Sequence, residues 1–283
     1  MPDLAEKLLY VLESQEFEKF YKHYILPILL KGGEENKSKD ILELYLEKIK
    51  VPECHIAILG VQGSGKSSLL NALLFGETVL PVEVQETTCI PTMVRRVYSE
   101  EEPGAEVHYK DGRVENVPLK VEFLEKVVDN RYNPGNIMDA DYVVCRVNNP
   151  FLKEGFVFVD LPGVGSLTEK NEETTIRFLQ NTNVGIFLLR TVPPITDSEA
   201  GFIRVAWPRL QDAIFVQNLW ARETESEIEE GIEHNKRVLE KIAQERNTMP
   251  PAIILAVNIA MAGEGASKRS EEHTSELQSR QSI

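Results

Sequence analysis

The sequence is poor in cysteine, in basic charge and in long apolar runs. Three cysteines among 283 residues are too few and too scattered for a disulfide framework or a zinc site. Acidic residues outnumber basic ones by 45 to 31, for a formal net charge of −14, and no basic block offers phosphate contacts to a nucleic acid. No apolar run approaches the roughly 18 residues of a membrane span, and the first residues lack the order of a secretory signal. We therefore expect a cytoplasmic protein without a nucleic-acid partner.

What the sequence does contain is an alternation of short apolar runs with amphipathic segments from residue 51 onward. The apolar runs predict strands at 55–60, 141–147, 156–161, 184–190, 213–219 and 252–258. The amphipathic segments predict helices at 66–75, 172–181, 197–206 and 226–245. This alternation indicates an α/β domain with a mostly parallel sheet flanked by helices. Between Thr92 and Val117, two strands are expected to flank Asp111-Gly112, a turn signal that predicts an antiparallel hairpin at the edge of that sheet.

The two ends of the chain differ from this pattern. Residues 1–50 carry apolar stripes of helical period at 3–31 and 39–50, so we expect N-terminal helices before an α/β domain at 51–262. Residues 263–283 are expected to be disordered. Within them, RSEEHTSELQS matches the translation of a common sequencing-library adapter. We interpret residues 269–283 as an artefact and the chain as an N-terminal fragment.

One motif carries most of the chemistry. The sequence GVQGSGKS matches GxxxxGK[ST] and lies between a predicted strand and a predicted helix. Glycines in such a loop let backbone N–H groups wrap around phosphate oxygens, and the helix N-terminus adds positive partial charge. Lys66 is expected to reach the β- and γ-phosphates, and the Ser67 hydroxyl is expected to hold Mg²⁺. The residues expected to bind the nucleotide here are Gly60, Gly63, Ser64, Gly65, Lys66, Ser67 and Ser68.

Two further segments are typical of the same kind of site. The motif DLPG runs from Asp160 to Gly163 at the end of an apolar run. At such a strand end an aspartate can hold Mg²⁺, and a glycine N–H can meet the γ-phosphate. The loop 80–92 lies between the first helix and the next strand, where a threonine can complete the Mg²⁺ shell when the γ-phosphate is present. Thr87 and Thr88 both qualify, and Thr88 is preferred.

Together these segments resemble the dynamin superfamily, and bacterial dynamin-like GTPases in particular. The resemblance runs from about residue 56 to 257 and includes GVQGSGKSSLLNALL, the LP…TT…PT loop, NPFLKEGFVFVDLPGVGS and TVPPITDSEAGFI. It implies a P-loop GTPase head that hydrolyses GTP to GDP and phosphate with Mg²⁺, self-associates, and is joined to a helical bundle. It also implies that Thr88 is the magnesium-binding threonine. A peripheral contact with membranes, coupled to their remodelling, would depend on a C-terminal region beyond this chain.

Some residues depart from the family pattern. Val164 stands where many small GTPases carry a water-orienting glutamine, whereas dynamins place a glutamine inside the phosphate loop, where Gln62 lies. The resemblance therefore implies that Gln62 is catalytic, together with Lys66 and Thr88. Gly63 replaces a serine that helps to bind a monovalent cation in dynamins, so side-chain coordination of that cation is lost.

The guanine-reading motif N/T-K-x-D is only partly present. Asn218 matches its first residue and is expected to contact the nucleotide. Leu219 replaces the lysine, and Ala221 replaces the aspartate that accepts hydrogen bonds from guanine. Since alanine has no acceptor, either another acid such as Glu223 substitutes or the choice of base is relaxed.

Two other functions are open on the sequence. A nucleotide-binding assembly module with little hydrolysis fits the changes at Gly63 and Ala221, and a single-turnover assay would separate it from a GTPase. A regulatory switch GTPase without membrane action would lack a long helical region with an apolar or basic tip. The acidic run 223–233 is expected to be a solvated helix face, and Trp207 and Trp220 are expected to be packing residues.

Overall fold

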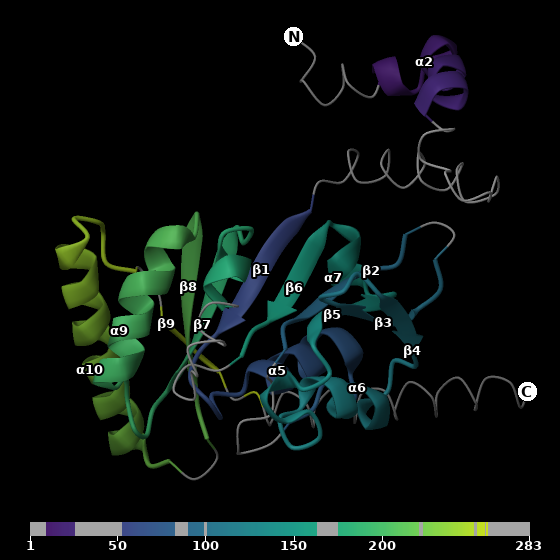
Figure 1. The fold of residues 1–283 in the computed structure, drawn as a ribbon. Coiled ribbons are helices and arrows are strands. Elements are labelled where there is room, and N and C mark those ends of the chain that lie inside the picture. The colour runs from purple at the N-terminus through teal and green to yellow at the C-terminus, as the bar shows by residue number, and fades with distance from the viewer. Residues whose placement is uncertain are drawn as a thin grey trace, which may run out of the picture.

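A mixed sheet forms the centre of the molecule (Figure 1). The computed structural model describes residues 10–25, 53–82, 90–98, 101–162, 175–220, 223–251, 254–257 and 259. Nine strands of these residues follow the order β4-β3-β5-β2-β6-β1-β7-β8-β9. In chain order they are β1 (Cys54–Leu59), β2 (Thr92–Arg96), β3 (Gly104–Tyr109), β4 (Val114–Val117), β5 (Ala140–Val147), β6 (Phe156–Asp160), β7 (Val184–Arg190), β8 (Asp212–Asn218) and β9 (Ile254–Val257).

The direction of the strands changes three times along this order, between β4 and β3, between β3 and β5, and between β2 and β6. β1 pairs parallel with β6 and β7, and β8 pairs parallel with β7 and β9. β2 is antiparallel to β6 and parallel to β5, while β3 is antiparallel to both β5 and β4. The predicted mostly parallel sheet and its antiparallel edge hairpin are therefore confirmed. The carboxyl ends of β1, β6, β7 and β8 meet at one edge of the sheet, where ligands of parallel sheets commonly bind.

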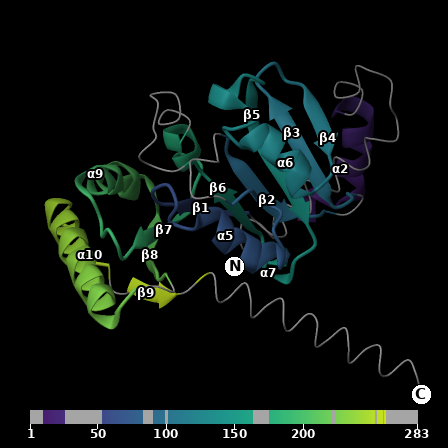
Figure 2. The ribbon, with the colours of Figure 1, turned by 90° about the horizontal axis from the view of Figure 1, so that it is seen from below.

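Helices cover both faces of the sheet. The helices of the described residues are α2 (Gln15–Phe20), η1 (Tyr21–Ile25), α5 (Lys66–Leu70), η2 (Asn71–Phe75), α6 (Val121–Val128), η3 (Pro134–Asn136), α7 (Pro150–Lys153), α9 (Asp197–Ala206), η4 (Trp207–Arg209) and α10 (Glu225–Glu245), with one further helical turn at 175–179. Figure 2 shows α5 and α6 well apart from α9 and α10. None of the helices in the described part of the chain is long and apolar enough to cross a membrane.

Two apolar cores lie on opposite faces of the sheet. Ile58 of β1 belongs to the core that includes residues of α5 and α6, whereas Ala57 and Leu59 belong to the core with residues of α9 and α10. All three side chains are buried, and they alternate because successive residues of a strand point to opposite faces. The apolar runs of the sequence follow from this burial on both sides.

Most of the predicted elements are present. The helices predicted at 197–206 and 226–245 correspond to α9 and α10, and each begins with a capping box, Thr196 with Glu199 and Thr224 with Glu227. Two strands are predicted between residues 92 and 117, where the structure has three, β2, β3 and β4. The predictions did not include α6, which has only eight residues. Too few periods repeat in such segments for their pattern to be distinct.

The ends of the chain are described only in part. α2 and η1 agree with the helix predicted at 3–31. The helix predicted at 39–50 and the tail at 263–283 lie outside the described residues.

The two tryptophans behave differently. The Trp207 ring meets Phe215 edge-on, with 5.0 Å between the ring centroids, so it packs as expected. Trp220 is 48% exposed, and the expectation that it packs is wrong. It lies in the loop directly after β8.

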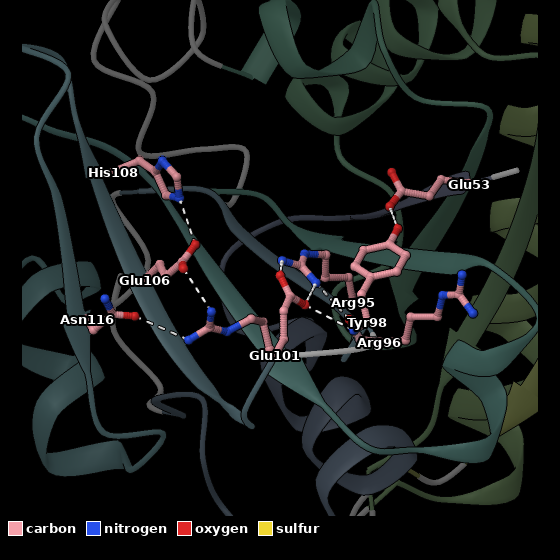
Figure 3. A network of polar contacts seen from close by, with 9 residues as sticks. Glu53, Arg95, Arg96, Tyr98, Glu101, Glu106, His108 and Asn116 are labelled. Carbon is pink, nitrogen blue, oxygen red and sulfur yellow. Dashed lines mark hydrogen bonds and ion pairs between the residues drawn. The ribbon is translucent and has the colours of Figure 1, made fainter. Parts of the chain in front are cut away.

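A polar network occupies the sheet face opposite to α6 (Figure 3). Arg95 of β2 donates to both carboxylate oxygens of Glu101, at 2.6 and 2.8 Å, and Arg146 of β5 donates to Glu106 of β3 at 2.9 Å. The Tyr98 hydroxyl donates to Glu53, which comes just before β1. The Tyr98–Glu53 contact therefore ties the segment after β2 to the amino end of β1, opposite to the edge where the carboxyl ends meet.

Candidate nucleotide-binding site

The GxxxxGKS motif forms the turn between β1 and α5. Gly60, Gly63 and Gly65 have φ values of 149°, 70° and 97°, a region that other residues rarely adopt. A Cβ atom on Gly60 would lie 2.6 Å from the Leu188 carbonyl oxygen, and one on Gly65 would lie 2.6 Å from Asn218 Nδ2. Both the backbone and the available space therefore require glycine in this loop.

Lys66 folds back over the loop. Its side chain is buried, and Nζ donates to the carbonyl oxygens of Gly60 at 3.2 Å and of Val61 at 3.1 Å. The ammonium group thus lies at the turn that the motif is expected to wrap around phosphates. Phosphate oxygens are stronger acceptors for an ammonium than neutral carbonyls, so this position favours an anionic ligand.

Ser67 and Asp160 bring two distant motifs together. Ser67 Oγ donates to Asp160 Oδ2 at 2.7 Å across 93 residues of sequence. The contact follows from the sheet, because β1 and β6 are parallel neighbours with Ile58 opposite Asp160. The predicted proximity of the phosphate loop and the DLPG motif is present in the structure.

The Asp160 carboxyl is fully enclosed. It is 2% exposed, and Oδ1 is buried with no hydrogen-bond partner among the described residues. Burial raises the pKa of Asp160, and the Lys66 charge and the Ser67 hydrogen bond offset this only in part. Hydroxyl and carboxylate oxygens are ligands that Mg²⁺ prefers, and it commonly keeps several waters. A buried, unpaired carboxylate oxygen beside a serine hydroxyl therefore fits a magnesium site.

Asn218 connects the end of β8 to the phosphate loop. It is 5% exposed, and Nδ2 donates to the Ser64 carbonyl oxygen at 2.9 Å. Its Oδ1 accepts from the backbone N–H of Ile259, just after β9, at 3.4 Å. The side chain is therefore oriented by backbone groups from two loops at the same edge, and its expected contact with the nucleotide stays a prediction.

The other predicted residues divide into two groups. Gln62 is half-buried in the loop, Ser68 is half-buried in the first turn of α5, and Ser64 is fully buried. The Ser64 hydroxyl finds no hydrogen-bond partner in the described part of the chain. Several residues named from the sequence lie outside the described residues, and their roles stay predictions: Thr87, Thr88, Gly163, Val164 and Ala221.

Sequence reasoning missed Asn71. This residue follows Ser67 by one helical turn and is 6% exposed. Its Oδ1 accepts from the N–H groups of Val79 and Leu80 at 3.1 and 2.8 Å, and Nδ2 donates to the Leu80 carbonyl at 2.8 Å. Asn71 therefore fastens the chain leading into the loop 80–92 to the phosphate-loop helix. The available signal was one amide within the apolar run LLNALL.

This geometry defines a class of protein. The site has a glycine-rich turn between a parallel strand and a helix, and a lysine and a serine follow this turn. The serine contacts the aspartate of a neighbouring strand. Together these features define a P-loop domain that binds nucleoside triphosphates.

The family follows from a match over the same region. The family model described as "Dynamin family" matches residues 56–218, more than half of the chain. The chain belongs to the dynamin family, and its sheet and phosphate loop are those of the P-loop GTPase domain of that family, as the sequence predicts.

Individual relatives are similar over most of this chain. An uncharacterised protein in the xynA 3′ region of Caldicellulosiruptor sp. (strain Rt8B.4) is 29% identical over 226 residues, which cover 80% of this chain and 54% of that protein. A bacterial dynamin-like protein of Nostoc punctiforme is 26% identical over 217 residues, covering 70% of this chain and 30% of that protein. The chain thus spans about half, or less, of the length of these relatives.

Solved structures share the fold. A structure titled as an oligomerised bacterial dynamin pair, which provides a mechanism for long-range sensing and tethering of membranes, has a TM-score of 0.59 and 20% identity. That match covers 94% of this chain and 41% of the other. A second structure of the same title has a TM-score of 0.58 and 22% identity, with 94% and 48% covered. Likeness at these identities shows the fold alone.

Proposed function

We propose that this chain is the GTPase head of a dynamin-like protein and that it hydrolyses GTP to GDP and phosphate. The observation that carries the proposal is the 2.7 Å contact between Ser67 and Asp160. It joins the phosphate loop to the DLPG motif at the edge where ligands of parallel sheets bind. Family membership supports GTP as the nucleotide.

In this proposal the phosphate loop holds and neutralises the triphosphate. Backbone N–H groups from Gly63 to Ser68 surround the phosphate oxygens, and Lys66 moves its hydrogen bonds from loop carbonyls to the β- and γ-phosphates. Ser67 and Asp160 are the residues that would hold Mg²⁺. When bound there, Mg²⁺ would supply positive charge to offset the charge that develops on the phosphate oxygens in the transition state.

The attacking water needs residues beside the γ-phosphate. We assign its orientation to Gln62, which is half-buried in the phosphate loop, for an in-line attack on phosphorus. Thr88 and Gly163 are assigned to the Mg²⁺ shell and to the γ-phosphate by the family pattern. Gly63 offers no side chain to a monovalent cation, so this head is expected to work without a side-chain ligand for one.

The role of the whole protein is proposed from the family. Residues 1–50 are assigned to a helical bundle that continues in a region beyond this chain, and residues 51–262 to the GTPase domain. Self-association of the head, and membrane remodelling from the cytoplasm, are supported by relatives whose titles describe an oligomerised pair that senses and tethers membranes. This chain alone provides the nucleotide cycle in that scheme.

The variant Lys66→Ala tests the proposal. It removes the buried cation of the loop, and we expect calorimetry to detect no GTP binding. Lys126→Ala, which removes an exposed lysine of α6, is the matched control and should bind as the wild type does. Micromolar GTP affinity in Lys66→Ala would refute the phosphate-loop assignment. A single-turnover assay of the wild type with Mg²⁺ should show GDP formation; tight binding without it would favour an assembly module.

A further inference from the structure

The loop after β8 contains a carboxylate that the proposed mechanism does not use. Glu223 Oε2 accepts from the backbone N–H of Trp220 at 2.8 Å, and the Glu223 N–H donates to the Trp220 carbonyl at 3.2 Å. The side chain therefore folds back over its own loop. This is a correction to the expectation that the acidic run 223–233 is solvated throughout, because Glu223 is half-buried whereas Glu225 is exposed.

The second oxygen of this carboxylate is buried and unpaired. Among the described residues, two carboxylate oxygens are buried without a hydrogen-bond partner, Oδ1 of Asp160 and Oε1 of Glu223. Most buried polar atoms of folded proteins are paired, and an exception calls for a specific explanation. For Asp160 the explanation proposed above is Mg²⁺. Glu223 lies in a loop at the same edge of the sheet and needs a donor rather than a second anion.

The helix that follows does not explain Glu223. α10 is capped by Thr224, whose hydroxyl accepts from the Glu227 N–H while Glu227 caps Thr224 in return. The helix start is therefore satisfied without Glu223. A role in bracing the loop explains the hydrogen bond from the Trp220 N–H to Oε2. It leaves the buried Oε1 without a partner in the described part of the chain.

The position of Glu223 relative to the phosphate loop follows from Asn218. Asn218 donates to the Ser64 carbonyl oxygen at 2.9 Å, and Trp220 comes two residues later. Two trans peptide units separate these Cα atoms by at most about 7.6 Å. The Glu223 carboxylate, which accepts from the Trp220 N–H, thus lies beside the start of the loop after β8. By resemblance to the family, this loop reads the base, and in its sequence Ala221 replaces the expected aspartate.

We propose that Glu223 is the specificity-determining residue that reads guanine in place of the missing aspartate. The inference rests on the proposed binding of GTP. Guanine presents two neighbouring donors, N1–H and the 2-amino group, and an ionised carboxylate only accepts. Oε1 accepts from one of these donors, and Oε2 uses its remaining lone pairs for the other. Adenine has an acceptor at N1 and no 2-amino group, so the same carboxylate disfavours ATP.

The test is direct calorimetric titration of wild type and variants with GTP, XTP and ATP. In Glu223→Gln the side chain gains an NH₂ donor that matches the carbonyl of xanthine where guanine has its amino group. We expect the Kd for GTP to rise roughly 10- to 150-fold and XTP to become the preferred nucleotide. Glu225→Gln, at an exposed position of the first turn of α10, is the matched control and should keep wild-type preferences. Glu223→Asp keeps the carboxylate and should still prefer GTP over XTP.

The outcomes separate this inference from the proposed function. An equal loss of affinity for all three nucleotides in Glu223→Gln would identify Glu223 as a brace of the loop and overturn the inference. Unchanged GTP preference in Glu223→Gln would overturn it too, while the GTPase assignment stands on the loss of binding in Lys66→Ala. A wild-type protein that prefers ATP would overturn both the inference about Glu223 and the GTPase assignment. Thermal unfolding followed by circular dichroism checks that each variant is folded. If Glu223→Gln does not fold, Glu223→Asp is titrated with the three nucleotides in its place.

Discussion

The replacement Gly231→Ala tests how α10 is seated against the end of β7. A Cβ atom on Gly231 would lie 2.7 Å from Thr191 Cγ2, 2.8 Å from the Thr191 carbonyl oxygen and 3.2 Å from its Cα. Two of these atoms belong to the backbone, so rotation of a side chain cannot relieve the contact. Thr191 is itself held, because it is 1% exposed and its hydroxyl accepts from Gln217 at 2.9 Å. The helix must therefore move away from the sheet.

Two opposing effects set the magnitude. Alanine is favoured over glycine in a helix interior by about 0.8–1 kcal/mol. Overpacking a filled site costs about 1–3 kcal/mol, and contacts below 3 Å with backbone atoms belong to the upper part of that range. We expect Gly231→Ala to lower the free energy of unfolding by about 1–2 kcal/mol.

Gly201→Ala provides the matched control. Gly201 lies inside α9, and a Cβ atom there would meet nothing within 4 Å. The same gain in helix propensity applies without the contact, so this variant should be stabilised by up to about 1 kcal/mol. Urea unfolding followed by circular dichroism measures both, provided that the denaturant dependence is the same in each variant. If both variants were stabilised alike, α10 would not pack on Thr191 and the reasoning would be refuted.

Two further predictions concern buried charges. Because burial raises the pKa of Asp160, Asp160→Asn should raise the free energy of unfolding of the nucleotide-free protein at neutral pH, and this gain should shrink as pH falls and the wild-type carboxyl takes up its proton. The same variant should lose Mg²⁺-dependent GTP affinity by about 10-fold or more. A variant less stable than wild type by urea unfolding would contradict the expected gain in stability. For Glu101, burial alone would raise the pKa, but hydrogen bonds from Arg95 lower it below its usual range. The Arg95–Glu101 ion pair therefore stabilises the fold at pH values above the usual glutamate pKa, and this stabilisation is lost as pH falls through the lowered pKa. Glu101→Gln should cost about 1–3 kcal/mol at pH 7 and nothing in strong acid, and a cost that is constant over a pH series would contradict the ion-pair explanation.

Much of the fold and of the phosphate loop could be predicted because their signals are local. The GxxxxGKS motif spans eight consecutive residues, and its glycines adopt the positive φ values that glycine permits. α9 and α10 carry several turns of periodic pattern and a capping box each. The meeting of Ser67 with Asp160 was also predictable, since carboxyl ends of parallel strands share an edge. α6, with eight residues, is too short for such a signal.

The sequence by itself therefore determined the fold class, the family and the place of the glycine-rich loop between a strand and a helix, because residue type and spacing along a few turns suffice for each. Only the tertiary structure decided which side chains meet across long separations. Three contacts depend on neighbours that a local pattern does not specify. They are the hydrogen bonds of Asn71 to the chain before the loop 80–92, the contact of Gly231 with Thr191, and the hydrogen bond of the Glu223 carboxylate to its own loop. Their physical basis is packing, which brings a buried donor of one segment against a buried acceptor of another segment far away in sequence. Periodicity along the chain does not predict such pairs.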